Sequence, residues 1–210
     1  MTEFWEKNFK EKQEMWGLQP ANSAVITSKL FAENKYKTIL IPGVGYGRNA
    51  QAFIAQGMDV TGIEISKTAI ELAEKEFGQS IKIYHGSVKD MPFDDEFYDG
   101  VFSHALIHLL DKNDRINMIS ACYNQLRDGG QMVFTTISKK AVTYGQGTLI
   151  SKDRYEQFGG VQTYFYDDIS INDEFASYGL YDVSEVTENY PFYLIKCCKN
   201  ANNTQDLTLN

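Results

Sequence analysis

Three glycines at alternate positions follow a short apolar segment, and this spacing is the clearest sign of chemistry in the chain. Residues 39–42 read Ile-Leu-Ile-Pro, and Gly43, Gly45 and Gly47 come directly after them. The apolar run predicts a buried strand, and the pattern over 47–56 predicts a helix. Glycine accepts a positive φ and lets a ligand approach the backbone. A helix N-terminus offers unpaired N–H groups. The segment therefore predicts a binding loop for an adenosine-containing ligand.

A carboxylate stands near the end of the next predicted strand, Val60–Ile65. Glu64 lies 17 residues beyond Gly47, which suits one helix plus one strand of a βαβ unit. A carboxylate in that place can accept hydrogen bonds from both ribose hydroxyls of an adenosine. The alternative is an exposed glutamate at a strand end, and the preceding glycine loop favours the nucleoside site.

Two further segments follow predicted strands. Residues 86–93 read Gly-Ser-Val-Lys-Asp-Met-Pro-Phe after the strand expected over 81–84. Ser103 and His104 end an apolar strand that begins at Gly100. Ligands of open α/β sheets bind at the carboxyl ends of the strands, so these residues are expected to share one site.

His104 and His108 stand four residues apart, the spacing of two metal ligands on one helix face. The sequence offers no third ligand, and we predict no metal site. A general base beside the reacting atom and a histidine that merely lines a pocket both stay open. We name His104 and His108 as the catalytic candidates.

The four motifs, in this order over residues 36–137, resemble class I S-adenosylmethionine-dependent methyltransferases. The resemblance implies the cofactor S-adenosyl-L-methionine and in-line transfer of its methyl group to a small-molecule acceptor. The glycine loop would hold the methionine end, Glu64 the ribose, and Ser87 with the Val88 N–H the adenine. The implied cofactor-binding residues are Gly43, Val44, Gly45, Gly47, Arg48, Asn49, Glu64, Ile65, Ser87, Val88, Ser103, His104 and Trp16.

The chain departs from the family pattern in two places. Ser87 replaces the usual Asp, and its uncharged oxygen accepts a weaker hydrogen bond. Ile41-Pro42 replaces the acid that often stands two residues before the first glycine. The Pro-Gly-x-Gly form resembles the thiopurine and thiol branch, whereas Gly159-Gly160 and Tyr164-Phe165 resemble tellurite-resistance methyltransferases.

Two other functions remain open. A nicotinamide-dependent oxidoreductase shares the glycine loop and the acidic strand end. Its G-x-G-x-x-G fingerprint needs a glycine at position 48 if it starts at Gly43, and at position 50 if it starts at Gly45. Position 48 is Arg and position 50 is Ala, so the fingerprint is absent in both registers. The same fold can also serve a non-catalytic S-adenosylmethionine-binding protein.

The amino-acid composition limits the classes of partner that the protein can bind. The 210 residues carry a net charge of −8, which disfavours a nucleic-acid groove. The 3 cysteines, without framework spacing, indicate reduced thiols and a cytoplasmic protein. Residues 1–16 lack the apolar core of a signal peptide, and no apolar run approaches the roughly 20 residues of a membrane span. We expect no membrane partner, and the oligomeric state is not determined.

The elements that position these motifs alternate along the chain. The pattern predicts a Rossmann-like α/β fold with a seven-stranded, mostly parallel sheet, helices on both faces and an antiparallel C-terminal strand. The link 188–191 is too short for a parallel crossover. Strands are expected over 38–42, 60–65, 81–84, 100–103, 132–137, 181–187 and 192–198. Helices are expected over 3–16, 22–34 (capped by Asn22 or Ser23), 47–56, 66–78 (capped by Ser66), 112–126 (burying Ile116) and 169–178.

We expect one methyltransferase domain over 1–199. Residues 1–34 would form a helical lid that brings Trp16 over the cofactor, and 138–168 an aromatic-rich insertion. The acceptor would enter between the two. Residues 200–210 are polar and are expected to form a disordered tail.

Overall fold

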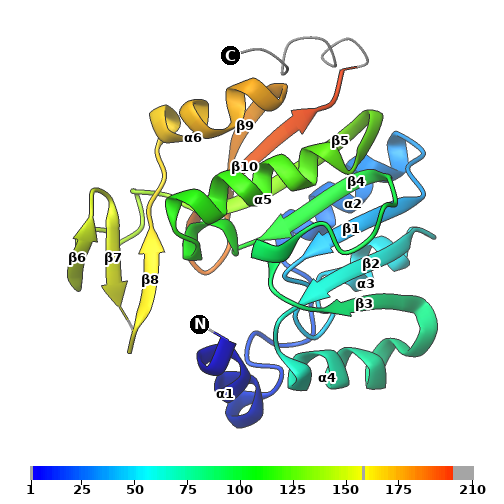
Figure 1. The fold of residues 1–210 in the computed structure, drawn as a ribbon, viewed down its shortest axis with the longest axis horizontal. Helices are drawn as coiled ribbons and strands as arrows, with labels where there is room; N and C mark the ends of the chain where they lie inside the picture. The colour runs from blue at the N-terminus through cyan, green and yellow to red at the C-terminus, as the bar shows by residue number, and fades with distance from the viewer. Residues whose placement is uncertain (1, 158, 201–210) are drawn as a thin grey trace.

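A seven-stranded sheet forms the centre of the protein, for which the computed structural model describes residues 2–157 and 159–200 (Figure 1). The strand order is β3-β2-β1-β4-β5-β10-β9. β10 runs antiparallel to β5 and β9, and the pairs among β1 to β5 are parallel. The predicted fold class is therefore confirmed. The strands are β1 (Thr38–Pro42), β2 (Asp59–Glu64), β3 (Ile81–His85), β4 (Tyr98–His104), β5 (Leu126–Ile137), β9 (Leu180–Thr187) and β10 (Pro191–Cys198).

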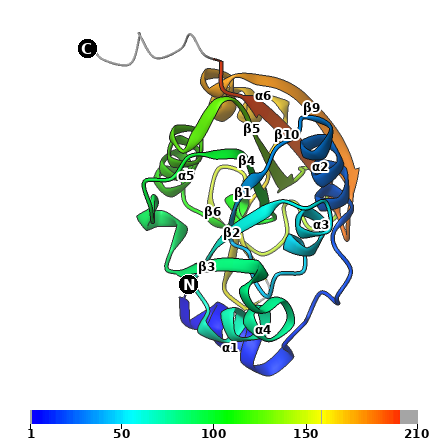
Figure 2. The same ribbon diagram turned by 90° about the vertical axis from the view of Figure 1, so that its right-hand side faces the viewer.

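Helices cover both faces of this sheet (Figure 2). One core packs α2 and α3 against the sheet through Phe31, Phe53 and Phe102, and a second core packs α5 and α6 against the other face through Ile119 and Phe175. Because both faces are covered, the central strands are nearly continuous apolar runs. The helices are α1 (Thr2–Lys12), α2 (Asn22–Glu33), α3 (Ala50–Ile54), α4 (Lys67–Phe77), α5 (Lys112–Asn124) and α6 (Asp168–Phe175), and the short 3-10 turns are η1 (Gly78–Ser80), η2 (Val88–Asp90), η3 (Ile107–Leu109) and η4 (Ala176–Tyr178).

Two helix caps were predicted, with different outcomes. Ser66 caps α4 as expected, since its Oγ accepts a backbone N–H at 3.2 Å. The predicted cap of α2 is wrong, because the N-cap is Ala21 and makes no side-chain bond. Glu188 replaces it by accepting the N–H groups of Asn22 at 3.2 Å and Ser23 at 2.8 Å. A cap 165 residues away in sequence leaves no local signal.

Three expected helices are shorter than the pattern indicated. The first ends at Lys12, the third spans only Ala50–Ile54, and α5 ends at Asn124. β5 starts at Leu126, where it pairs with β4, so strand pairing overrides the helical pattern at that point. Ile116 is 42% exposed and not buried, because α5 turns its neighbour Arg115 inward instead.

The insertion forms a small antiparallel sheet, which no sequence pattern predicted. Its strands are β6 (Thr148–Ser151), β7 (Arg154–Gln157) and β8 (Val161–Tyr164). Figure 1 shows this sheet beyond the carboxyl ends of β1 and β4. Tyr166 joins it to the main sheet, since its N–H bonds the Ile137 carbonyl at 3.0 Å and its carbonyl accepts the Lys139 N–H at 2.9 Å.

The predicted tail falls on residues 201–210, which lie outside the described residues. Over the part of the chain that is described, no helix is long and apolar enough to cross a membrane.

Candidate functional site

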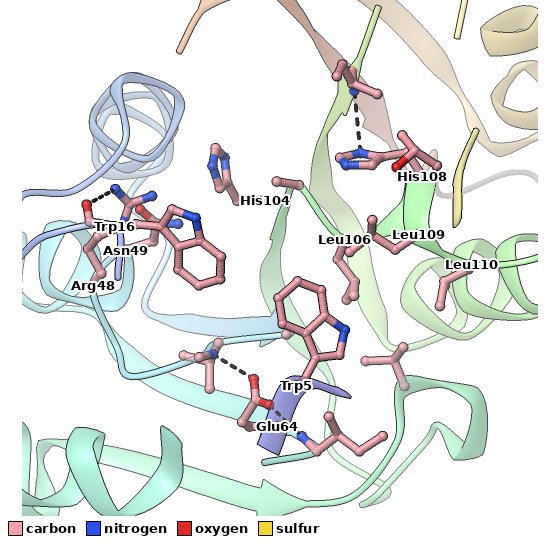
Figure 3. Close-up of a pocket in the computed structure, with 18 of the residues that line it drawn as sticks. Trp5, Trp16, Arg48, Asn49, Glu64, His104, Leu106, His108, Leu109 and Leu110 are labelled. Carbon is pink, nitrogen blue, oxygen red and sulfur yellow. Dashed lines mark hydrogen bonds between the residues drawn. The ribbon is translucent and has the colours of Figure 1, made fainter. Parts of the chain in front are cut away.

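A cavity of about 370 Å³ opens at the carboxyl ends of the parallel strands (Figure 3). One part, which we call the glycine end, is lined from the loops after β1, β2 and β3 by Gly43, Val44, Gly45, Tyr46, Arg48, Asn49, Ile63, Glu64, Ile65, Gly86, Ser87, Val88 and Lys89. The other part, the histidine end, is lined by His104, Ala105, Leu106, His108, Leu109, Leu110, Ile137, Thr143, Gln157, Thr163, Glu188, Asn189, Tyr190 and Phe192. Trp5, Phe9 and Trp16 complete the wall.

The three alternate glycines have three different roles. All have positive φ, at +72° for Gly43, +59° for Gly45 and +83° for Gly47. A Cβ on Gly43 would lie 2.7 Å from Leu106, and one on Gly47 would lie 2.5 Å from Phe77. Those two glycines therefore allow protein side chains to pack against the loop. Gly47 does not line the cavity.

Gly45 is the glycine of this loop whose missing side chain leaves space in the cavity. A Cβ there would meet only Phe9, at 3.9 Å. The space that a side chain would fill is thus the cavity beneath α1, and it is free for a ligand.

Glu64 is buried, with 6% of its surface exposed, and its carboxylate organises the loop around it. Oε2 accepts the Gly45 N–H at 2.9 Å, and Oε1 accepts the N–H groups of Ile65 at 2.8 Å and Ser66 at 2.9 Å. Burial raises the pKa of Glu64, and these backbone bonds oppose the rise. A carboxylate has about four acceptor positions. Three are used here, so Oε2 can still accept a ligand hydroxyl.

The loop after β3 is shaped by the packing of Gly86 against Phe93. A Cβ on Gly86 would lie 2.3 Å from the Phe93 ring, which stacks on Tyr84 at 5.9 Å. Ser87 accepts the Lys89 N–H at 3.3 Å, and Lys89 forms an ion pair with Asp114 of α5. These contacts hold Ser87 and Val88 on the cavity wall.

Helix α1 lies across the glycine end and is attached to α4 by one carboxylate. The Ser66 hydroxyl donates to Glu6 Oε2 at 2.7 Å, and the Thr68 hydroxyl donates to Glu6 Oε1 at 2.8 Å. The hydrogen bond from Ser66 is the main reason that the pKa of Glu6 falls to about 2. No sequence pattern indicated this role for Glu6, or the position of Phe9 on the cavity wall.

Trp16 lines the cavity where it was predicted, and the glycine loop holds it there. Arg48 donates to the Trp16 carbonyl at 3.0 Å, and Asn49 accepts the Ala21 N–H at 2.9 Å. Tyr46 stacks on Trp16 with ring centroids 6.3 Å apart. Arg48 and Asn49 thus anchor the N-terminal segment while they line the cavity.

At the other end, His104 and His108 both reach the cavity. His104 Nδ1 lies 3.0 Å from the hydroxyls of Ser23 and of Thr135. His108 Nδ1 accepts the Ile137 N–H at 3.4 Å. Burial is the main cause that lowers the pKa of His104 to about 4 and that of His108 to about 3. Both imidazoles are therefore neutral at neutral pH.

Ser103 is buried beside the site and does not line the cavity. Its hydroxyl donates to the Pro42 carbonyl at 3.2 Å, which joins β4 to β1. The other predicted residues, apart from Gly47, lie on the wall. Among the described residues, no three His, Cys, Asp or Glu side chains are arranged to hold a metal ion.

Several wall residues carried no sequence signal, because they come from the insertion, from the turn between β9 and β10 and from the start of β10. They are Thr143, Gln157, Thr163, Asn189, Tyr190 and Phe192. Only the high aromatic content of these segments hinted at a role.

Comparison with known proteins agrees with this geometry. Residues 40–134 match the family described as a methyltransferase domain. The fold superposes on the crystal structure of 1,6-didemethyltoxoflavin-N1-methyltransferase from Burkholderia thailandensis, which has bound 1,6-didemethyltoxoflavin and S-adenosylhomocysteine. The TM-score is 0.74 at 14% identity, over 95% of this chain and 87% of that one. Residues 40–134 therefore resemble a methyltransferase domain, and the fold as a whole resembles that of a solved methyltransferase structure.

Two curated methyltransferases are similar in sequence over part of their length. The O-methyltransferase cnsE of Penicillium expansum is 31% identical over 106 residues, which are 47% of this chain and 37% of that protein. Thiocyanate methyltransferase 1 of Arabidopsis thaliana is 24% identical over 133 residues, 61% of this chain and 59% of that protein. The chain thus spans well under two thirds of either relative. None of these matches supports the nicotinamide alternative.

The residues at the glycine end of the cavity fit S-adenosylmethionine. Gly45 leaves the space above the loop free, and Glu64 keeps one acceptor position for a ribose hydroxyl. Ser87 and Val88 line the wall where the adenine is expected. The fit rests on groups that the fold holds in place without a ligand.

Proposed function

We propose that residues 1–199 act as one methyltransferase domain that transfers the methyl group of S-adenosylmethionine to a small, uncharged acceptor. The observation that carries this proposal is the continuity of one cavity between the glycine end and the histidine end. Its volume of about 370 Å³ lies in the range of small-molecule sites. The cofactor supplies a methyl group already activated on a sulfonium, so the protein mainly has to align the acceptor.

Each part of the wall has a role in this proposal. Gly45 gives room to the methionine end, Glu64 accepts from the ribose, and Ser87 with the Val88 N–H binds the adenine. Residues 1–34 and the insertion 138–168 cover the cavity from two sides and exclude water from it. The acceptor lies against the imidazoles of the histidine end.

Charge at the histidine end favours an uncharged acceptor. Glu188 is the one Asp, Glu, Lys or Arg side chain on that part of the described wall. Its oxygens already bind the N–H groups of Asn22 and Ser23. Thiocyanate, named for the Arabidopsis relative, is an anion, and no Lys or Arg side chain lines this end for it. A flat neutral ring, like the compound bound in the Burkholderia structure, suits the aromatic wall better.

We place the protein in the cytoplasm, on the support of its three free cysteines, Cys122, Cys197 and Cys198. Free thiols persist in reducing compartments.

Calorimetry followed by turnover tests the proposal. We expect S-adenosylhomocysteine to bind and NADH not to bind, and labelled methyl to pass from S-adenosylmethionine to members of a panel of phenols, heterocycles and thiols. Binding of NADH alone would point to the oxidoreductase. Binding of S-adenosylhomocysteine without transfer to any acceptor of a broad panel would favour a non-catalytic sensor.

A further inference from the structure

The two cavity histidines are held by different partners, although they share one wall. Figure 3 shows His104 at the end of β4 and His108 on η3, both at the histidine end. The Phe192 ring lies beside both imidazoles. It is parallel to His104, with ring centroids 6.0 Å apart, and edge-on to His108, with ring centroids 5.7 Å apart. For both rings, Nε2 has no hydrogen-bond partner among the described residues, and it is available to a molecule in the cavity.

The proton of His108 is fixed by a backbone donor. Its Nδ1 faces the N–H of Ile137 at 3.4 Å, and an N–H can only donate. The Thr136 hydroxyl, also at 3.4 Å, can donate to the same nitrogen. Nδ1 therefore carries no proton. Burial lowers the pKa of this ring to about 3, so the ring is neutral and its proton sits on Nε2. His108 presents a hydrogen-bond donor to the cavity.

On His104, in contrast, the neighbouring groups allow the proton to stay on Nδ1. Its Nδ1 faces two hydroxyls at 3.0 Å, those of Ser23 and Thr135, and a hydroxyl can donate or accept. Thr135 Oγ1 also accepts the Ala105 N–H at 3.0 Å and still has a second acceptor position. Nδ1 can therefore keep a proton, which leaves the Nε2 lone pair free toward the cavity.

Two charged groups and one neutral imidazole face His104 from three parts of the chain. Glu188, in the turn between β9 and β10, raises its pKa, and Arg48, before α3, lowers it. His108 lies on η3 and is neutral. Burial outweighs these effects and brings the pKa of His104 to about 4. The neutral imidazole is free to accept a proton from the methyl acceptor during the transfer.

We propose that His104 accepts the proton of the methyl acceptor while His108 donates a hydrogen bond to a neighbouring atom of the same molecule. The substrate class is then a flat ring with an O–H or N–H beside a carbonyl oxygen or ring nitrogen. This inference rests on the proposed function. In the transfer, the acceptor oxygen or nitrogen forms the bond to the methyl carbon as the carbon–sulfur bond breaks. The electron pair of that bond goes to sulfur, and the proton goes to His104 Nε2 and then to solvent.

Methyl acceptors of matched shape test the proposed substrate class. 8-Hydroxyquinoline carries an O–H beside a ring nitrogen, 1-naphthol has the same shape without that nitrogen, and 1-naphthalenethiol offers a thiolate that needs no base. We expect kcat/KM for 8-hydroxyquinoline to exceed that for 1-naphthol by about tenfold or more, since one hydrogen bond distinguishes them. Equal rates for these two would overturn the inference.

Matched variants separate the two histidines. Asparagine keeps a polar group near the position of Nδ1 and removes Nε2, so His104→Asn and His108→Asn are directly comparable. His104→Asn should lower kcat for 8-hydroxyquinoline by about 10²-fold or more and change thiol methylation little. His108→Asn should raise KM and erase the preference over 1-naphthol. Loss of both reactions to the same degree in either variant would contradict the assigned roles.

A measurement without turnover gives a second test. The chain has 3 histidines, and the third, His85, is exposed, so ¹⁵N spectra of histidine-labelled wild-type protein are simple to assign with the two variants. We expect the Nε2–H form for His108 and the Nδ1–H form for His104. An Nδ1–H form of His108, or an Nε2–H form of His104, would refute the inference.

Different results would refute the substrate class and the proposed methyltransferase function. Binding of S-adenosylhomocysteine with methylation of the thiol alone would refute the substrate class and leave the methyltransferase function standing. Failure to bind S-adenosylhomocysteine would remove the proposed function itself.

Discussion

The glycine end and the histidine end of one cavity are built in opposite ways. The glycine end comes from residues 43–49, 63–65 and 86–89, so all of it follows three consecutive strands within 47 residues of chain. The histidine end joins the segment after β4 to the insertion and to the turn after β9. One end is local in sequence, and the other exists only after long-range folding.

The two ends also use different groups. The glycine end presents backbone N–H groups and one buried carboxylate, whose positions follow from the chain path. The histidine end presents side chains, and the state of its imidazoles depends on partners such as Ser23, far away in sequence. A substitution at the histidine end is therefore expected to change specificity without touching the loop that we propose holds the cofactor.

The largest expected effect is at Gly45. Gly45→Val should abolish measurable binding of S-adenosylhomocysteine in calorimetry, because the side chain fills the cavity below Phe9. Gly57→Val is the control, since its φ of +75° imposes similar backbone strain with nothing within 4 Å. Both variants should lose about 1–2 kcal/mol of stability. Normal binding by the Gly45 variant would mean that the cofactor does not approach this loop.

Glu64→Ala should have the next largest effect. We expect the binding free energy of S-adenosylhomocysteine to weaken by about 1–3 kcal/mol, as hydrogen bonds to a charged group are lost. The melting temperature should also fall, because three backbone N–H groups lose their acceptor. Glu71→Ala, an exposed glutamate on α4, should change neither quantity. Unchanged affinity with a lowered melting temperature would make Glu64 purely structural.

Glu6→Ala should have a smaller effect, on the covering helix. Without the hydrogen bonds from Ser66 and Thr68, α1 should detach more often and release S-adenosylhomocysteine several-fold faster in stopped-flow measurements. The lost hydrogen bonds correspond to about 0.5–1.5 kcal/mol in the free energy of closing α1 over the cavity. Glu11→Ala is the control on the same helix, since Glu11 contacts only Lys7 at 3.9 Å and is 57% exposed. Equal release rates from the two variants would contradict the role of α1 as a cover.

The same contact predicts a pH dependence. The pKa of Glu6 falls from 4.5 to about 2 on folding, so its contribution is fully present above pH 4.5. It should be lost as the pH falls from 4.5 toward 2. The fluorescence of Trp5 and Trp16 in the wild type should therefore change between pH 4.5 and 2 and approach that of Glu6→Ala at the acid end, whereas the variant should show no such change in this range.

The strand order and the glycine end could be predicted because their signals are local. Apolar runs mark the buried strands, Ser66 marks the start of α4, and the spacing from Gly47 to Glu64 fits one βαβ unit. The roles of the individual glycines could not be predicted. Gly47 was expected to face the ligand, yet it faces Phe77, which lies 30 residues later in the chain.

The sequence alone indicated the sheet, the class of cofactor and the carboxylate that we propose accepts from the ribose, since these depend on the order of residues within single βα units. Only the tertiary structure decided which imidazole nitrogen carries a proton, which carboxylate caps α2, and how α1 closes the glycine end. Those properties depend on pairs such as His104 with Ser23, or Glu6 with Ser66, that lie far apart in sequence. Hydrogen bonds act over about 3 Å, so such pairs exist only once the chain has folded.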